Sequence, residues 1–278
     1  MFDTCLVVSD MDGTLLNHHD YQFKAALPML ERLEDLKIPV IFNTSKTFAE
    51  LKDWVALLNN RHPFIVENGS AIYIPQNYFP HNFQPEILTG LKYESGYQVL
   101  LTGIDIQPIK EFLKSQKPDA IDLTQCSLEQ AVEITGLSGS DATAAQNRKF
   151  SVPLLFHDAL QQQEFSDQAI RAGFGILKGG RFLHVLGRCD KGQSMQVLKS
   201  LYEDCYKKKY GIIVLGDSPN DIAMLQQADV PVIVKSPSSA SFALDHPATI
   251  VTQSEAPEGW VEGIETAFER INITLEQE

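Results

Sequence analysis

The stretch that decides the fold is residues 5–14, which read Cys-Leu-Val-Val-Ser-Asp-Met-Asp-Gly-Thr. Its apolar run, Leu6 to Val8, is typical of a short buried strand. Two acidic residues, Asp10 and Asp12, follow at once, and Gly13 comes next. Because open α/β sheets bind ligands at the carboxyl ends of their strands, these carboxylates are candidates for nucleophilic and acid–base chemistry. A solvated turn rich in Asp and Gly is the competing interpretation.

Alternating strand and helix signals around this stretch indicate an α/β fold with a parallel, Rossmann-like sheet. Apolar spacing predicts strands at 39–42, 64–66, 211–215 and 230–234, and helices at 25–37, 48–58, 194–206, 219–228 and 259–270. The segment between about Tyr78 and Leu186 is longer than the other connections, and its strand and helix signals are less regular. We therefore predict a core domain formed by residues 1–80 and 187–278, with residues 81–186 inserted as an α+β domain.

A second polar segment follows the predicted strand at 39–42 and contains Thr44, Ser45 and Lys46. A hydroxyl group and an ammonium group at a strand end are able to bind phosphoryl oxygens. The competing interpretation is a helix N-cap, because the next predicted helix begins at Phe48.

Two further segments complete the pattern. Lys191 lies just before a predicted helix, where an ammonium group and the helix N-terminus both favour an anion, although most lysines are merely solvated. Asp217 and Asp221 follow the predicted strand at 211–215 and offer the hard oxygen ligands that magnesium prefers. A helix cap would explain Asp217 but not the second carboxylate.

Together, the four segments resemble the haloacid-dehalogenase (HAD) superfamily of phosphohydrolases. The resemblance implies that Asp10 is the nucleophile, that Asp12 is the general acid and base, and that Thr44 and Lys191 bind the phosphoryl group. It also implies a Mg²⁺ cofactor, with Asp10, Asp12, Asp217 and Asp221 as the metal-site residues. The position of the insertion is similar to that of a C2B-type cap domain.

A narrower resemblance, to the mannosyl-3-phosphoglycerate phosphatase family, rests on Glu67-Asn68-Gly69, on residues 179–184 (Gly-Gly-Arg-Phe-Leu-His) and on residues 216–221 (Gly-Asp-Ser-Pro-Asn-Asp). It implies hydrolysis of 2-O-mannosyl-3-phosphoglycerate through an aspartyl phosphate. The predicted substrate-binding residues are Ser45, Lys46, Asn68, Arg148, Lys178, Arg181 and His184. The segment 149–153 departs from the acidic pattern of many members, which leaves the sugar open.

Composition excludes other classes of function. The net charge of −13 argues against a nucleic-acid partner, and no apolar run approaches the roughly 20 residues of a membrane helix. Without a secretory signal, a cytoplasmic enzyme for a small phosphorylated glycoside is expected; oligomeric state has no sequence signal. Alternatives are a sucrose- or trehalose-phosphate type of phosphatase, a phosphomutase, and a regulatory binding protein on the same scaffold.

Overall fold

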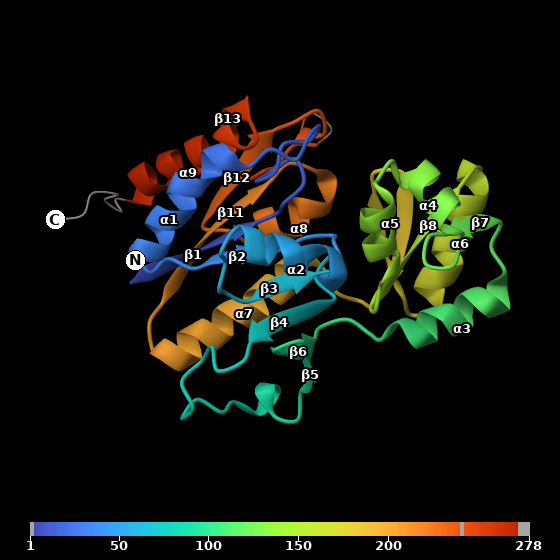
Figure 1. The fold of residues 1–278 in the computed structure, drawn as a ribbon, viewed down its shortest axis with the longest axis horizontal. Helices are drawn as coiled ribbons and strands as arrows, with labels where there is room; N and C mark the ends of the chain where they lie inside the picture. The colour runs from blue at the N-terminus through green and yellow to red at the C-terminus, as the bar shows by residue number, and fades with distance from the viewer. Residues whose placement is uncertain (1–2, 240–241, 272–278) are drawn as a thin grey trace.

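The computed structural model describes residues 3–239 and 242–271. Its centre is a five-stranded sheet in which all neighbouring strands are parallel (Figure 1). The strand order is β13 (Ile250–Glu255), β12 (Val230–Lys235), β11 (Tyr210–Gly216), β1 (Thr4–Ser9) and β2 (Val40–Phe42). The predicted α/β core is confirmed.

Helices cover both faces of this sheet, which explains why its strands are continuous apolar runs. On one face, Cys5 and Val7 of β1 pack among residues of three helices. On the other face, Leu6 and Val8 pack against two helices. The first face is covered by α1 (Leu27–Asp35), α2 (Phe48–Leu57) and α9 (Glu258–Ile271), and the second by α7 (Lys191–Tyr206) and α8 (Ile222–Leu225).

A second sheet begins where the sequence predicted a further parallel strand. Residues Phe64–Val66 form β3, which is parallel to β2, as predicted, through one isolated bridge from Asn43 to Ile65, and which pairs antiparallel with β4. The chain reverses here because Glu67, Asn68 and Gly69 all have positive φ. The order is β3 (Phe64–Val66), β4 (Ala71–Pro75), β6 (Tyr97–Leu101) and β5 (Lys92–Glu94).

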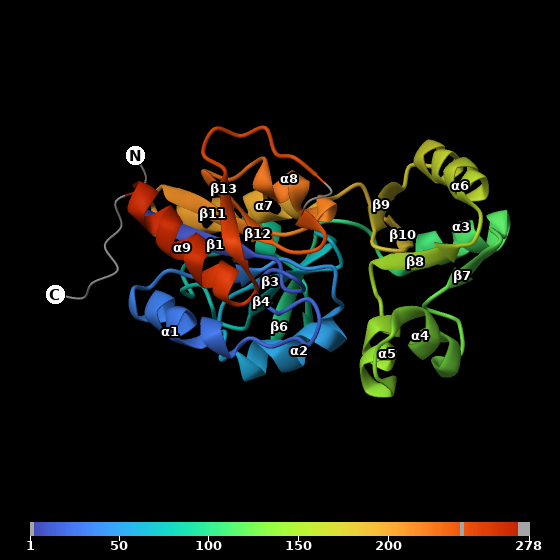
Figure 2. The ribbon, with the colours of Figure 1, turned by 90° about the horizontal axis from the view of Figure 1, so that it is seen from above.

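The inserted segment forms a third sheet, which lies beside the core (Figure 2). Its antiparallel strands are β7 (Ala120–Asp122), β8 (Ser151–Phe156), β10 (Phe182–Leu186) and β9 (Gly175–Gly179). One face packs on α3 (Ile106–Gln116) and α6 (Ala159–Arg171), while α4 (Leu128–Thr135) and α5 (Gly139–Gln146) form a separate small cluster. Since β6 pairs with β4 and β5 pairs with β6, both strands belong to the second sheet, and we propose that the inserted domain begins near Gly103 rather than at residue 81.

Short 3₁₀ segments also connect these elements, among them η1 (Lys24–Ala26), η2 (Glu86–Leu88) and η3 (Pro219–Asp221). The predicted helix at 219–228 is therefore shorter than expected, since it divides into η3 and the single turn of α8.

Helix α9 supports the end of β1 directly. The indole Nε1 of Trp260 donates a hydrogen bond of 2.9 Å to the hydroxyl of Ser9, which itself donates to the carbonyl of Asp10. We expect Trp260→Phe to lower the free energy of unfolding by about 1–3 kcal/mol, because it leaves a buried hydroxyl without its donor and loses packing volume. Urea denaturation measures this change.

The control for that variant is Tyr93→Phe, which removes a hydroxyl from a ring that is 62% exposed. It is expected to change the free energy of unfolding by no more than about 0.5 kcal/mol. Equal effects of the two substitutions would show that the Trp260–Ser9 hydrogen bond does not stabilise the fold.

Candidate active site

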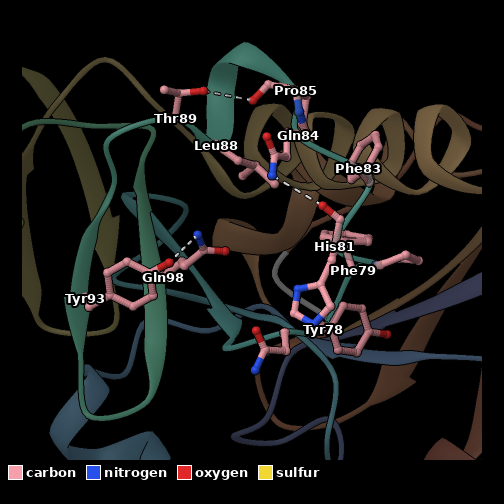
Figure 3. Close-up of a pocket in the computed structure, with 12 residues that line it drawn as sticks. Tyr78, Phe79, His81, Phe83, Gln84, Pro85, Leu88, Thr89, Tyr93 and Gln98 are labelled. Atoms are coloured by element: carbon pink, nitrogen blue, oxygen red, sulfur yellow. Dashed lines mark hydrogen bonds between the residues drawn. The ribbon is translucent and has the colours of Figure 1, made fainter.

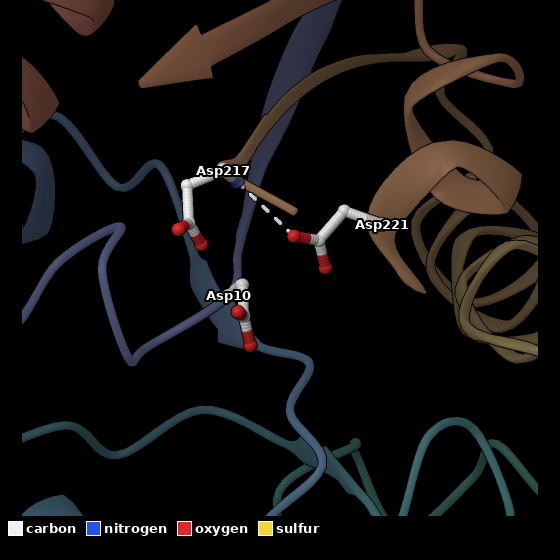
Figure 4. A group of neighbouring side chains, drawn as sticks. All are labelled: Asp10, Asp217 and Asp221. Carbon is white, nitrogen blue, oxygen red and sulfur yellow. Dashed lines mark hydrogen bonds between the residues drawn. The ribbon is translucent and has the colours of Figure 1, made fainter. Parts of the chain in front are cut away.

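Three buried carboxylates meet at the carboxyl edge of the central sheet (Figure 4). Asp10 follows β1 and Asp217 follows β11, and these strands are parallel neighbours, so both side chains leave the sheet at the same edge. Asp221 comes from η3. One oxygen from each of the three carboxylates lies within 4.8 Å of the other two.

Lys191, the first residue of α7, is the cation of this cluster. Its Nζ donates to Oδ1 of Asp10 at 2.9 Å and to Oδ1 of Asp221 at 2.7 Å. Burial alone would lower the pKa of Lys191, but the charges of Asp10 and Asp221 outweigh that effect and raise it. Lys191 therefore keeps its charge, and it joins two carboxylates that are far apart in the sequence.

One ammonium group does not balance three carboxylates. Burial raises the pKa of Asp10 even against the field of Lys191, and the charges of Asp221 and Asp217 raise it further. Burial and the charge of Asp221 raise the pKa of Asp217 to about 7, although Ser236 and Thr14 hydrogen-bond to it. A buried site with this excess of negative charge is suited to a divalent cation.

The absence of a side chain at Gly13 leaves room for the carboxylate of Asp217. Gly13 has a φ of +76°, and a Cβ at this position would lie 2.4 Å from Oδ2 of Asp217. Asp221 is already occupied, since its Oδ2 accepts the backbone N–H groups of Asp217 and Ser218, each at 3.1 Å. Asp10 and Asp217 are therefore the side chains best placed to hold Mg²⁺, and Asp221 orients Lys191.

Asp12 lies at the solvent side of the cluster and pairs with a different cation. Its Oδ2 is 2.8 Å from Nζ of Lys46, and its side chain is 38% exposed. Lys46, by contrast, is buried. Burial would lower the pKa of Lys46, but Asp12 and Glu50 raise it, so the ammonium is charged. A candidate proton donor and a fixed positive charge thus lie side by side.

The predicted phosphate-binding loop lies at the same edge. Thr44 is buried, and its hydroxyl accepts the N–H of Lys46 at 3.2 Å. Asn68 donates its backbone N–H to the carbonyl of Thr44 at 2.9 Å. Its side-chain oxygen accepts a hydrogen bond of 3.4 Å from Asn220, next to Asp221. The fold therefore connects Thr44 and Asn68 with the metal-site segment.

Arg148 contacts the same loop from the inserted segment. Its guanidinium donates to the carbonyl of Ser45 at 3.0 Å and to the hydroxyl of Ser151 at 2.9 Å. His184 is buried nearby, and burial, together with the charge of Arg148, lowers its pKa to about 3, so it is neutral. The partners of Arg148 are protein groups, and substrate binding by Arg148 and His184 stays a prediction.

Two predicted residues lie apart from the carboxylates. Lys178 and Arg181 are exposed on the β9–β10 hairpin, and Arg181 lies 3.4 Å from the carbonyl of Thr135. Within residues 3–239 and 242–271, no hydrogen bond or ion pair joins either side chain to Asp10, Asp12 or Asp217. Their roles stay predictions.

Glu67 is a residue whose role the sequence analysis missed. Its carboxylate accepts the N–H groups of Lys149 and Phe150, at 2.9 and 3.2 Å, and the hydroxyl of Ser151 at 2.6 Å. Arg148 lies 3.7 Å away. The sequence signal was a carboxylate placed directly after the apolar strand Phe64–Val66, a position where burial demands partners.

A hollow between the loop at residues 77–89 and the β5–β6 hairpin has different chemistry (Figure 3). It encloses about 320 Å³ between Tyr78, Phe83 and Tyr93. None of its lining residues carries a carboxylate, and it shares no residue with the cluster of Asp10, Asp217 and Asp221.

Comparison with known proteins agrees with this geometry. The family model of haloacid dehalogenase-like hydrolases matches residues 7–148 and 179–264. The chain belongs to this family. Glucosyl-3-phosphoglycerate/mannosyl-3-phosphoglycerate phosphatases from Persephonella marina and Methanococcoides burtonii are 34% and 33% identical to it. These alignments cover 93% and 91% of this chain and 95% and 92% of the relatives. The chain is a hydrolase of phosphoric monoesters.

Solved structures support the fold. A phosphatase of the same superfamily from Bacteroides thetaiotaomicron matches with a TM-score of 0.65 at 18% identity, over 98% of this chain and 96% of that one. A Thermotoga maritima protein matches with a TM-score of 0.65 at 19% identity, over 98% of each chain. Among the described residues, the helices are too short or too polar to cross a membrane.

The excess of buried carboxylates leads to a prediction about metal binding. Mg²⁺ at about 100 times its Kd is expected to raise the melting temperature of the EDTA-treated protein by about 5 °C, because it binds only the folded site. Asp217→Asn is expected to abolish most of that rise. Asp245→Asn, at an exposed position, is the matched control and is expected to keep it.

The same experiment has a pH dependence whose sign follows from Asp217. A carboxyl group with a raised pKa in the folded state binds protons more tightly when folded, so protons compete with Mg²⁺ below about pH 7. The rise in melting temperature at pH 8 is therefore expected to exceed that at pH 6. An equal rise at both pH values, or in the Asp217→Asn variant, would contradict a site built on this carboxylate.

Proposed function

We propose that this enzyme hydrolyses glycosyl-3-phosphoglycerates, with 2-O-mannosyl-3-phosphoglycerate giving mannosylglycerate and phosphate in a Mg²⁺-dependent reaction. The observation that carries the proposal is the similarity to two phosphatases named for these substrates, over more than nine-tenths of the chain. The ion pair between Lys46 and Asp12 supports it. A glycerate leaving group carries a carboxylate close to the oxygen that Asp12 would protonate, and Lys46 offers that carboxylate a positive charge.

In this mechanism Asp10 attacks the phosphorus atom, and the bond from phosphorus to the glycerate oxygen breaks. Asp12 donates its proton to that oxygen, so mannosylglycerate leaves with a neutral hydroxyl group where the phosphate was attached. A water molecule then attacks the phosphorus atom, Asp12 accepts its proton, and the bond from phosphorus to the Asp10 oxygen breaks, which releases phosphate and restores the Asp10 carboxylate. Thr44 and Lys191 stabilise the charge that develops on the other phosphoryl oxygens.

Mg²⁺, held by the carboxylates of Asp10 and Asp217 and by the backbone carbonyl of Asp12, would neutralise phosphoryl charge when bound. Lys191 holds Asp10 in place through its hydrogen bond of 2.9 Å, and Asp221 fixes Lys191 at 2.7 Å. A substrate dianion can approach the buried nucleophile because these positive charges oppose the net charge of −13 of the whole chain.

Asp10→Asn tests the covalent step. A carboxamide does not attack phosphorus, so kcat is expected to fall by at least about 10³-fold while the melting temperature stays close to that of the wild type. Steady-state phosphate release measures the first quantity and calorimetry the second. Activity within about tenfold of wild type would contradict nucleophilic attack by Asp10.

A substrate panel tests the assignment. The wild-type enzyme is expected to have a kcat/KM for mannosyl- or glucosyl-3-phosphoglycerate that is at least about 100-fold above that for sucrose 6-phosphate, trehalose 6-phosphate and glucose 6-phosphate, because each charge-assisted contact with the glycerate carboxylate contributes about 1.5–3 kcal/mol. A preference for the plain sugar phosphates would contradict the assignment. Transfer of phosphate to a second sugar position would indicate a mutase, and binding without turnover would indicate a regulatory protein.

A further inference from the structure

A cleft between the core and the inserted segment lies next to the Lys46–Asp12 pair. It encloses about 360 Å³, within the range of about 300–1,000 Å³ typical of small-molecule sites. The core side contributes Tyr21, Lys46 and Trp54, and α5 and the loop before it contribute Leu137, Ser140 and Asp141.

We propose that this cleft binds the whole leaving group of the substrate, with a carboxylate on Lys46 and a sugar ring against Tyr21 and Trp54. The inference rests on the proposed function, and it assigns sugar recognition to Tyr21, Trp54 and α5, none of which the sequence analysis singled out.

The position of Lys46 decides the direction of the leaving group. The phosphoryl group must lie at Asp10, and the oxygen that leaves must meet Asp12. Lys46 lies 2.8 Å from Asp12 and lines the cleft. A leaving group that extends from Asp12 toward Lys46 therefore enters this cleft, and among the lining residues Lys46 is the basic side chain that a glycerate carboxylate can reach.

The aromatic residues suit the apolar face of a sugar ring. Tyr21 and Trp54 have ring centroids 6.5 Å apart and planes tilted by 38°, and Nζ of Lys46 lies 5.4 Å from the Tyr21 ring centre. Trp54 is fixed by an edge contact with Phe23, at 5.7 Å. The backbone N–H of Tyr21 donates to the carbonyl of Asn17 at 3.1 Å, which holds the loop closed.

Acidic side chains supply hydrogen-bond acceptors for the hydroxyl groups of a sugar. Glu50 and Asp53 from α2 and Asp141 from α5 line the cleft, and carboxylates accept hydrogen bonds from sugar hydroxyl groups. These acids would repel a second phosphate group. The lining therefore fits hydroxyl groups along these acids, with the one carboxylate of the leaving group beside Lys46.

The two walls are held together beside the cleft. The hydroxyl of Thr47 donates to the carbonyl of Ala144 in α5 at 2.9 Å and accepts the N–H of Glu50 at 3.1 Å. Thr47 thus caps α2 and contacts α5 at the same time. This contact sets the distance between the aromatic wall and the wall that carries Ser140 and Asp141.

Ser140→Trp tests the cleft, because Ser140 is exposed on α5 and an indole at this position would occupy the space of the sugar. Acetyl phosphate is the reference substrate, since its leaving group does not fill the cleft. The ratio of kcat/KM for mannosyl-3-phosphoglycerate to that for acetyl phosphate is expected to fall at least tenfold. The inhibition constant of mannosylglycerate as a competitive inhibitor is expected to rise at least tenfold.

Thr143→Trp is the matched control, since Thr143 is exposed on the same helix but outside the cleft lining. It is expected to leave both activities unchanged. An unchanged substrate ratio in Ser140→Trp, or an equal loss with both substrates, would overturn the inference. Failure of the proposed function would give a different result, because the wild-type enzyme itself would then show no preference for glycosyl-3-phosphoglycerates.

Discussion

The arrangement of the active site depends on the buried contact of Lys191 with Asp10 and Asp221. The three residues come from the end of β1, the start of α7 and the segment after β11, and Lys191 is fully buried among them. Removal of Lys191 would leave these buried carboxylates without a cation, a change that costs about 3–5 kcal/mol, whereas removal of the Asp10 charge leaves Lys191 paired with Asp221. Fold and proposed chemistry are therefore coupled, because the charge balance that stabilises this edge of the sheet also positions Asp10, the proposed nucleophile.

The inserted segment is connected to the same edge by polar contacts. Arg148 donates to the carbonyl of Ser45, next to Thr44, and Glu67 accepts hydrogen bonds from the chain just after Arg148. A movement of the inserted segment would therefore act on the phosphate-binding loop through Ser45. Closure of the inserted segment over the core would therefore exclude water and position the phosphoryl group in the same movement.

Much of the core followed from local patterns. The apolar run before Asp10 predicted a buried strand, and the same pattern before Asp217 predicted its parallel neighbour, so their meeting at one sheet edge followed from topology. The second sheet did not follow, because β5 has intermediate to exposed residues and lacks a strong apolar signal. The strand at Phe64–Val66 runs parallel to β2, as predicted, but three positive φ angles after it reverse the chain into β4, which the sequence did not predict.

The sequence by itself predicted which residues would carry the chemistry, because Asp10 and Asp217 each follow an apolar strand and Lys191 lies at the start of a helix, and these are local signals. Only the tertiary structure decided their partners. It paired Lys46 with Asp12, and it joined Glu67 to residues 82 to 84 positions later in the chain. Such contacts depend on how the inserted segment packs on the core, and periodicity along the chain carries no information about that packing.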